Sequence, residues 1–382
     1  MVLILSQTLA LLMTMLFPVE AAVNSNPHPN AKVNAVEGYY SYWKRKYLIP
    51  SARFPGEWKV DYNGKGATVS EAIGYGMLIT VLMADKDLAA KKYFDGLNAF
   101  RRQFPSSINP SFMCWKIPAH ERPHPSDSAT DGDLDIAYAL ILAHKCWGED
   151  RYLSEAKTLI GNIAASLVRS DGSLRLGDWN RRPGQTRSSD FMPTHFRAFG
   201  KATGDPLWEK VEKRCYAILR ELQEGSAPRT GLVPDFAVEK EGRWVPAGPG
   251  FLEGCNDGNY YYNACRVPWR LGWAALALND ERARKFLKPL MGWVSGSIPT
   301  PEEFRAGYHL DGSSVRNSDF DAACFIAPTG VAARALGNRE WEQSVFSYGK
   351  RKKEEYYSDS VNLLCLILIS GKVHDSGWMA GG

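Results

Sequence analysis

Two kinds of helical pattern alternate along this chain, and this alternation is the feature that most restricts its fold. One kind has a single apolar stripe, as an amphipathic helix does. The other is apolar on nearly every side, so neighbouring structure must bury it all round. The amphipathic segments are 36–48, 87–103, 152–169, 206–223, 281–295 and 339–349. The apolar segments are 69–84, 131–147, 190–202, 266–279, 319–336 and 358–370. Strict alternation of the two kinds predicts an all-α fold, with a closed ring of buried helices inside a ring of half-buried ones.

Long connections precede the apolar segments, and short turns follow them. The longest are 49–68, 104–130, 170–189 and 224–265, all rich in Gly, Pro, Trp and charged residues. Inner helices in such a ring run parallel, so these loops are expected to gather on one face around the inner N-termini. Long loops inside a compact domain are usually functional. We therefore expect one catalytic domain, 23–382, with its site on that face.

The N-terminal segment has the pattern of a secretory signal peptide. Residues 2–17 are apolar and are followed by Pro18-Val19-Glu20-Ala21-Ala22, a small-residue cleavage site. A membrane anchor is the alternative, but the run is short for a span. We expect a signal peptide at 1–22 and a secreted protein that is not held in the membrane after cleavage.

Charge and aromatic content indicate the class of partner. The net charge is +4, and no block of Lys and Arg with interleaved aromatic residues marks a nucleic-acid surface. The chain has 12 Trp, which is high. Flat rings suit a sugar-binding groove, although most of them are expected in the core. A polysaccharide is the predicted partner, bound by a monomer.

Seven cysteines are too few and too scattered for a disulfide scaffold, and their spacing resembles no zinc site. Cys255 and Cys265 bracket one loop and are a candidate pair. Cys146, Cys324 and Cys365 lie in apolar helical runs, where they are expected to be core thiols. No metal or cofactor is predicted.

Glu71 begins the first apolar segment, in TVSEAIGYGM. Thr68-x-x-Glu71 has the spacing of a capping box, and this structural interpretation stays open beside a catalytic one. Gly74 and Gly76 follow, although each glycine costs a helix about 1 kcal/mol relative to alanine. The two glycines predict that another group approaches this helix closely.

Three alternating carboxylates, Asp131, Asp133 and Asp135, stand at the start of the second apolar segment. A calcium loop is excluded because Ile136 and Leu142 occupy the positions that require Gly and Glu. Capping the helix N-terminus uses one or two acids, not all three. The group is therefore a candidate site.

The loop GFLEGCNDGNYYYNACRVPWR, 250–270, combines acids, three consecutive Tyr and a cation. A solvated turn is the structural alternative. However, Arg266 at a helix start is electrostatically unfavourable unless it meets an acid. Trp115 and Asp190 hold equivalent positions on neighbouring loops. Separated carboxylates beside aromatic platforms are the residues that a glycoside hydrolase uses to cleave a glycosidic bond with an acid and a base.

The segment ATDGDLDIAYALILAHKCW, 129–147, resembles the signature of glycoside hydrolase family 8 along its full length. Six further segments resemble the family in the same order: YWKRKYL, SEAIGYGM, MCWK, YNACRVPWR, SDFDAA and YYSDSVNLLCLILISG. The resemblance implies an (α/α)6 barrel of six inner and six outer helices that hydrolyses β-1,4-linked glycans with inversion.

The resemblance also implies roles for individual residues. Glu71 would be the general acid, and Asp131 would position the distorted sugar ring beside Arg266 and Tyr262. The family often has a base Asp at the position of Asn263, and an amide cannot deprotonate water.

That departure is similar to a branch of the family in which the base is a Glu of the preceding loop. Glu253 is the matching position, and the same branch has Asp190 where other members have Tyr. Trp115, Asp190, Tyr262, Asn263 and Arg266 are then the candidate substrate-binding residues. The branch contains chitosanases as well as lichenan and cellulose hydrolases.

Inversion would place the carboxyl groups of Glu71 and Glu253 roughly 6.5–9.5 Å apart. A helix N-terminus lowers a carboxyl pKa, whereas a general acid needs a raised one. Burial and repulsion from Asp131 must therefore raise the pKa of Glu71.

We expect an endo-hydrolase of β-glucan. A chitosanase is the alternative, with Asp190 and Asp257 as acids for a cationic substrate, and xylan is disfavoured by the branch. A glycan-binding protein that has lost catalysis is the alternative of another class, suggested by Asn263.

Overall fold

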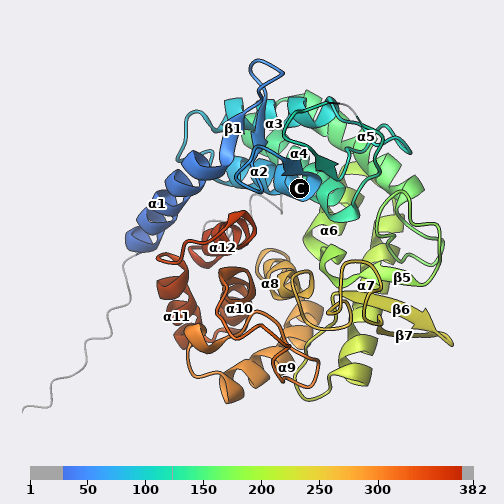
Figure 1. The fold of residues 1–382 in the computed structure, drawn as a ribbon, viewed down its shortest axis with the longest axis vertical. Coiled ribbons are helices and arrows are strands. Elements are labelled where there is room, and N and C mark those ends of the chain that lie inside the picture. The colour runs from blue at the N-terminus through green and yellow to red at the C-terminus, as the bar shows by residue number, and fades with distance from the viewer. Residues whose placement is uncertain (1–28, 123, 372–382) are drawn as a thin grey trace, which may run out of the picture.

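The computed structural model describes residues 29–122 and 124–371; the expected signal peptide lies outside them. Six helices form an inner ring, each packed against the next, and the last contacts the first. Figure 1 shows the ring closing where α12 lies beside α2. The inner helices are α2 (Ser70–Leu82), α4 (Thr130–Trp147), α6 (Pro193–Thr203), α8 (Val267–Ala277), α10 (Ala323–Leu336) and α12 (Tyr356–Ile369).

Six outer helices cover this ring, and each packs against an inner one. They are α1 (Pro29–Tyr47), α3 (Ala90–Arg102), α5 (Asp150–Ser166), α7 (Leu207–Ser226), α9 (Glu281–Ser297) and α11 (Arg339–Gly349). The outer helices bury one stripe, whereas nearly every residue of α2, α10 and α12 is buried. The predicted (α/α)6 barrel is confirmed.

Short strands, which the sequence pattern did not indicate, pair the loops with one another. They are β1 (Leu48–Pro50), β2 (Trp58–Val60), β3 (Thr68–Val69), β4 (Lys116–Ile117), β5 (Gln185–Arg187), β6 (Phe236–Lys240) and β7 (Arg243–Pro246). The strands have only two to five residues, too few to show alternation. In the sheet β5-β6-β7, Arg187 pairs with Phe236, which joins the loop before α6 to the loop before α8.

Glycines bring α2 and α4 into close contact, as the sequence predicted. A Cβ atom on Gly74 would lie 2.8 Å from the Asp135 Cβ and 3.3 Å from the Gly132 carbonyl oxygen. A Cβ atom on Gly132 would in turn overlap Ser70. The N-terminal turns of the two helices therefore pack backbone against backbone, which sets Glu71 beside Asp131.

Gly74→Ala is expected to lower the free energy of unfolding by about 1–3 kcal/mol, because the added methyl group overpacks a rigid contact. Gly161→Ala is the matched control. Gly161 lies in α5, and a Cβ atom added there would meet nothing within 4 Å, so alanine should stabilise the helix by up to about 1 kcal/mol. Urea unfolding of both variants checks this. Equal stabilisation by both would refute close packing at Gly74.

The candidate pairing of Cys255 with Cys265 is wrong. All seven cysteines, which lie within the described residues, are free thiols; Cys255 is exposed and Cys265 is buried. The Cys265 thiol lies 3.2 Å from the Tyr262 carbonyl oxygen. Burial of Cys265 under the α8 N-terminus removes it from the loop surface that Cys255 occupies. Cys324 and Cys365 are buried, as expected, and Cys146 is partly buried.

Candidate active site

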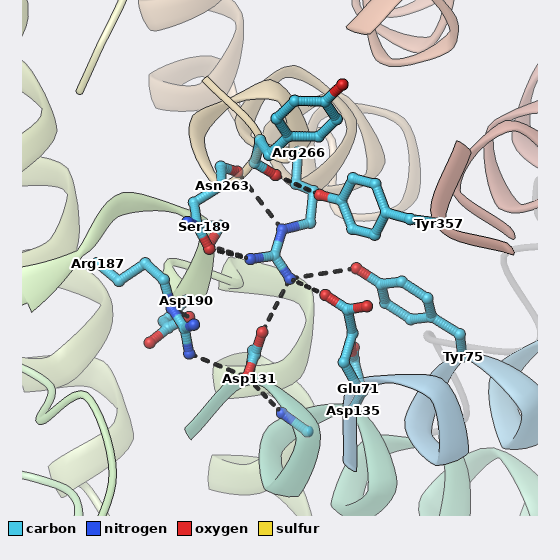
Figure 2. A network of polar contacts seen from close by, with 12 residues as sticks. Glu71, Tyr75, Asp131, Asp135, Arg187, Ser189, Asp190, Asn263, Arg266 and Tyr357 are labelled. Carbon is cyan, nitrogen blue, oxygen red and sulfur yellow. Dashed lines mark hydrogen bonds and ion pairs between the residues drawn. The ribbon is translucent and has the colours of Figure 1, made fainter. Parts of the chain in front are cut away.

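Arg266 lies at the centre of a polar cluster where the inner N-termini meet (Figure 2). Its Nη1 donates to Glu71 Oε2 at 3.0 Å and to Asp131 Oδ2 at 2.8 Å. Its Nη2 donates to Ser189 at 2.9 Å and to Asn263 Oδ1 at 2.7 Å. The guanidinium thus joins residues of α2, α4, the loop before α6 and the loop before α8. The acids expected beside this cation at the start of a helix are present.

Glu71 occupies the second position of α2, which begins at Ser70 after the N-cap residue Val69. The capping-box interpretation is wrong: Val69 makes no side-chain cap, and the buried Thr68 hydroxyl has no hydrogen-bond partner among the described residues. Thr68 is instead held in β3, paired with Ile117 of β4. The Glu71 carboxylate accepts from the Tyr356 hydroxyl at 3.2 Å and faces the cluster.

Burial raises the pKa of Glu71 to about 7. The Arg266 guanidinium opposes this rise, and the Asp131 carboxylate adds to it. Desolvation and like-charge repulsion therefore outweigh the opposing effect of the guanidinium groups, as a general acid requires. A carboxyl group with this pKa can carry a proton near neutral pH.

Asp131 has the opposite environment, although it is also buried. Burial alone would raise its pKa, but the guanidinium groups of Arg187 and Arg266 hold the pKa of Asp131 well below its usual range. Arg187 lies 2.9 Å from Oδ1, and the Gly132 N–H donates to the same oxygen at 3.0 Å. Two neighbouring acids thus differ in pKa: Glu71 can hold a proton up to about neutral pH, whereas Asp131 is anionic there.

The other two acids of the DGDLD run lie outside this cluster. Asp135 forms a two-pronged ion pair with Arg270, at 2.8 and 2.6 Å, and contacts His195 at 2.9 Å. All three side chains are buried, and the contacts tie α4 to α6 and α8. Asp133 is buried and accepts from the Met113 N–H at 3.4 Å. Asp135 therefore has a core role beyond the start of α4.

Glu253 lies on the loop before α8 with a side chain that is 51% exposed. Its Oε2 accepts from the Asn263 amide at 2.9 Å, and its Oε1 lies 4.0 Å from Arg187. Asp257 fixes the loop by accepting from the backbone N–H groups of Leu252, Glu253 and Gly254. The structure thus holds Glu253 at the rim of the cluster, with an open side towards solvent.

A cavity of about 520 Å³ adjoins Glu253. It is lined by Trp115, Asp127, Ser128, Ala129, Leu176, Trp179, Arg187, Leu252 and Glu253. Trp115 is 44% exposed, so its ring is available to a ligand. Two indole rings and two carboxyl groups around one hollow resemble the groove that the sequence predicted, with Trp179 as an additional platform.

One candidate substrate-binding residue, Asp190, lies deeper than the sequence suggested. Asp190 is fully buried, and Arg187 donates to it at 2.9 Å. Burial raises the pKa of Asp190 to about 7, against the effect of Arg187. The Tyr262 ring packs against Phe325 and Tyr357. Asp190 thus reaches the cluster through Arg187.

Sequence reasoning missed several members of the site: Tyr75, Arg187, Ser189, Asp235 and Tyr356. Arg187 left one usable signal, because an Arg three residues before Asp190 can pair with it. Asp235 left none, because its contacts with Tyr261, Asn263 and Ala264 depend on how the loop before α8 folds.

Among residues 29–122 and 124–371, no cluster of three or more His, Cys, Asp or Glu side chains is arranged to hold a metal ion. None of the helices in these ranges is long and apolar enough to cross a membrane. The carboxyl groups and guanidinium ions around Arg266 can supply proton transfer and electrostatic stabilisation.

Comparison with known proteins agrees with this chemistry. The family model described as glycosyl hydrolases family 8 matches residues 1–371. A β-glucanase of Niallia circulans is 41% identical over 353 residues, which cover 90% of this chain and 85% of that protein. An endoglucanase of Bacillus sp. (strain KSM-330) is 39% identical, covering 88% of this chain and 76% of that protein. The structure of a β-1,3-1,4-glucanase from Paenibacillus sp. X4 superposes with a TM-score of 0.87 at 41% identity, covering 90% and 93% of the two chains.

Proposed function

Because this chain belongs to glycoside hydrolase family 8, we propose that it is a secreted, inverting endo-hydrolase of β-glucan, acting on β-1,4 bonds as in lichenan and cellulose. The observation that carries the proposal is the unequal pair of acids on Arg266. Glu71, with a pKa of about 7, can donate a proton, and Asp131 stays anionic. Glu253 stands apart from both, held by Asn263.

The proposed reaction has one step. Glu71 gives its proton to the glycosidic oxygen as the bond from that oxygen to the anomeric carbon breaks. Glu253 takes a proton from a water molecule, whose oxygen attacks the same carbon from the opposite face. The products are a free alcohol and a hemiacetal of inverted configuration.

Asp131 is proposed to position the sugar ring and to stabilise positive charge on it in the transition state. A fixed, water-excluded anion is most effective where charge develops. Arg187 and Arg266 keep the Asp131 carboxylate ionised and oriented. Trp115, Asn263, Arg266 and Tyr262 are proposed to bind substrate, with Asp190 acting through Arg187.

The activity of the free enzyme is expected to fall as pH rises through about 7. Only the protonated form of Glu71 can act as the acid, and its pKa is raised to about 7. The measurement is kcat/KM for lichenan across the range from acidic to alkaline pH. A profile that stays flat well above neutral pH would contradict the assignment of Glu71.

The two acids considered for a cationic substrate do not favour chitosan, because neither is a free carboxylate of the groove. Asp190 and Asp257, the acids considered for a cationic substrate, are buried and bound to Arg187 and to three backbone N–H groups. Arg187 lines the cavity together with two acids, Asp127 and Glu253, so the choice of a neutral glucan does not rest on the charge of the cavity wall. The relatives named above are glucanases, which supports the same choice.

A panel of lichenan, carboxymethylcellulose, chitosan and xylan tests the proposal. We expect the highest kcat/KM on lichenan, with oligosaccharides of several lengths among the earliest products. Preference for chitosan would identify the chitosanase alternative. Binding of glycans without product release would identify the non-catalytic one.

Secretion and a monomeric state are part of the proposal. The signal-peptide pattern at 1–22 supports export. A monomer is proposed as the active unit.

A further inference from the structure

The Asn263 amide has a fixed orientation because its two ends face groups of opposite charge. Its Oδ1 accepts from Arg266 Nη2 at 2.7 Å. Its Nδ2 donates to Glu253 Oε2 at 2.9 Å and to Asp235 Oδ2 at 3.3 Å. A flipped amide would place NH₂ against a guanidinium and an oxygen against two carboxylates. The contacts therefore define which atom is which.

Asp235 is the second carboxylate on this amide, and it is only 3% exposed. Its Oδ1 accepts from the backbone N–H groups of Tyr261 and Ala264, at 2.9 and 2.6 Å. Asp235 thus holds the backbone on both sides of Asn263 as well as the amide itself. The loop and the side chain are fixed by one buried group.

Glu253 has few other constraints. Its side chain is half exposed, and its nearest cation, Arg187, is 4.0 Å away. The Asn263 contact is the shortest side-chain contact of its carboxylate among those of the described residues. A base that must aim at one water molecule on a solvent-exposed rim depends on such a contact, because small misplacements cost about 10²-fold in rate.

We propose that Asp235 is a positioning residue for the base: it orients the Asn263 amide, and the amide holds Glu253 in its productive direction. This inference rests on the proposed function of Glu253. It also explains an amide at 263, because an aspartate carboxylate there would have no N–H to donate to Asp235 and Glu253.

Asp235→Asn tests the inference with almost no change in shape. The new amide can keep its carbonyl oxygen towards the N–H groups of Tyr261 and Ala264, which leaves its NH₂ facing the NH₂ of Asn263. We expect kcat on lichenan to fall about 10- to 100-fold with KM changed less than about 3-fold. Asp280→Asn is the control, since Asp280 is a buried aspartate that caps α9, at the opposite end of the barrel. It should keep wild-type kcat.

A double-mutant cycle separates positioning of the base from a general structural role. In the Glu253→Ala background there is no base to orient, so adding Asp235→Asn should change the residual hydrolysis rate by less than about 2-fold. An equal loss in both backgrounds, or wild-type kcat in Asp235→Asn alone, would overturn the inference while leaving Glu253 as the base. Full turnover in Glu253→Ala would instead overturn the proposed function itself.

Discussion

Glu71→Gln is expected to lower kcat for lichenan by about 10²- to 10⁴-fold, the usual contribution of a positioned general acid. The amide keeps the size of the side chain, and its oxygen can still accept from Arg266 while its NH₂ donates to the Tyr356 hydroxyl, so the site should retain its shape. It has no acidic proton to give to the leaving oxygen. Steady-state kinetics at the pH optimum measures the loss, and the fall in activity above a pH of about 7 should vanish with it.

The control for Glu71→Gln is a second substrate whose leaving group needs no general acid. A dinitrophenyl glycoside needs little protonation when its bond breaks, so the variant should retain most of the wild-type rate on such a substrate. An equal loss on both substrates would mean that the substitution damages the site as a whole rather than proton donation alone. Near-normal turnover of lichenan would remove Glu71 from the role of acid.

Glu253→Ala is expected to lower kcat by a similar factor, about 10²- to 10⁴-fold, because water then attacks without a base. The space left by the side chain admits a small anion. Azide should restore turnover by attacking the anomeric carbon directly, and the product should be an α-glycosyl azide. Mass spectrometry and NMR identify it.

Azide rescue tests the base more directly than a comparison with Asp257→Asn, a variant of another acid in the same loop, because Asp257 also holds this loop in place. Asp257 accepts from the backbone N–H groups of Leu252, Glu253 and Gly254, so its loss should loosen the loop that carries the base. Reduced activity in Asp257→Asn would therefore not identify a base. A Glu253→Ala variant that loses activity without azide rescue would argue for a structural role of Glu253.

The barrel could be predicted because the alternation of apolar and amphipathic helical segments extends along most of the chain. A helix that is apolar all round can only be buried, and six of them alternating with amphipathic helices leave few arrangements. The close approach at Gly74 could also be predicted. A glycine lowers the stability of a helix relative to alanine, and close packing explains why a buried helix contains one. Both signals lie in the local sequence.

The hydrogen bonds and ion pairs of the site were harder to predict from the sequence, because they join loops that are distant along the chain. Arg187 lies in β5 and Asp235 directly before β6, and the pairing of these strands of three and five residues joins two loops that are distant in the sequence. Asp190 and Asp257 look like groove acids in the sequence, and tertiary structure buries both. The capping box at Thr68 fails for a related reason: pairing of β3 with β4 holds Thr68 in a strand.

The configuration of the first product tests the central claim most directly. Lichenan oligosaccharides are hydrolysed in an NMR tube, and the anomeric proton of the new reducing end is followed before mutarotation. A water molecule activated by Glu253 opposite Glu71 predicts that the α-anomer appears first and the β-anomer follows. Initial formation of the β-anomer would mean retention, with a carboxylate acting as nucleophile, and would contradict the account.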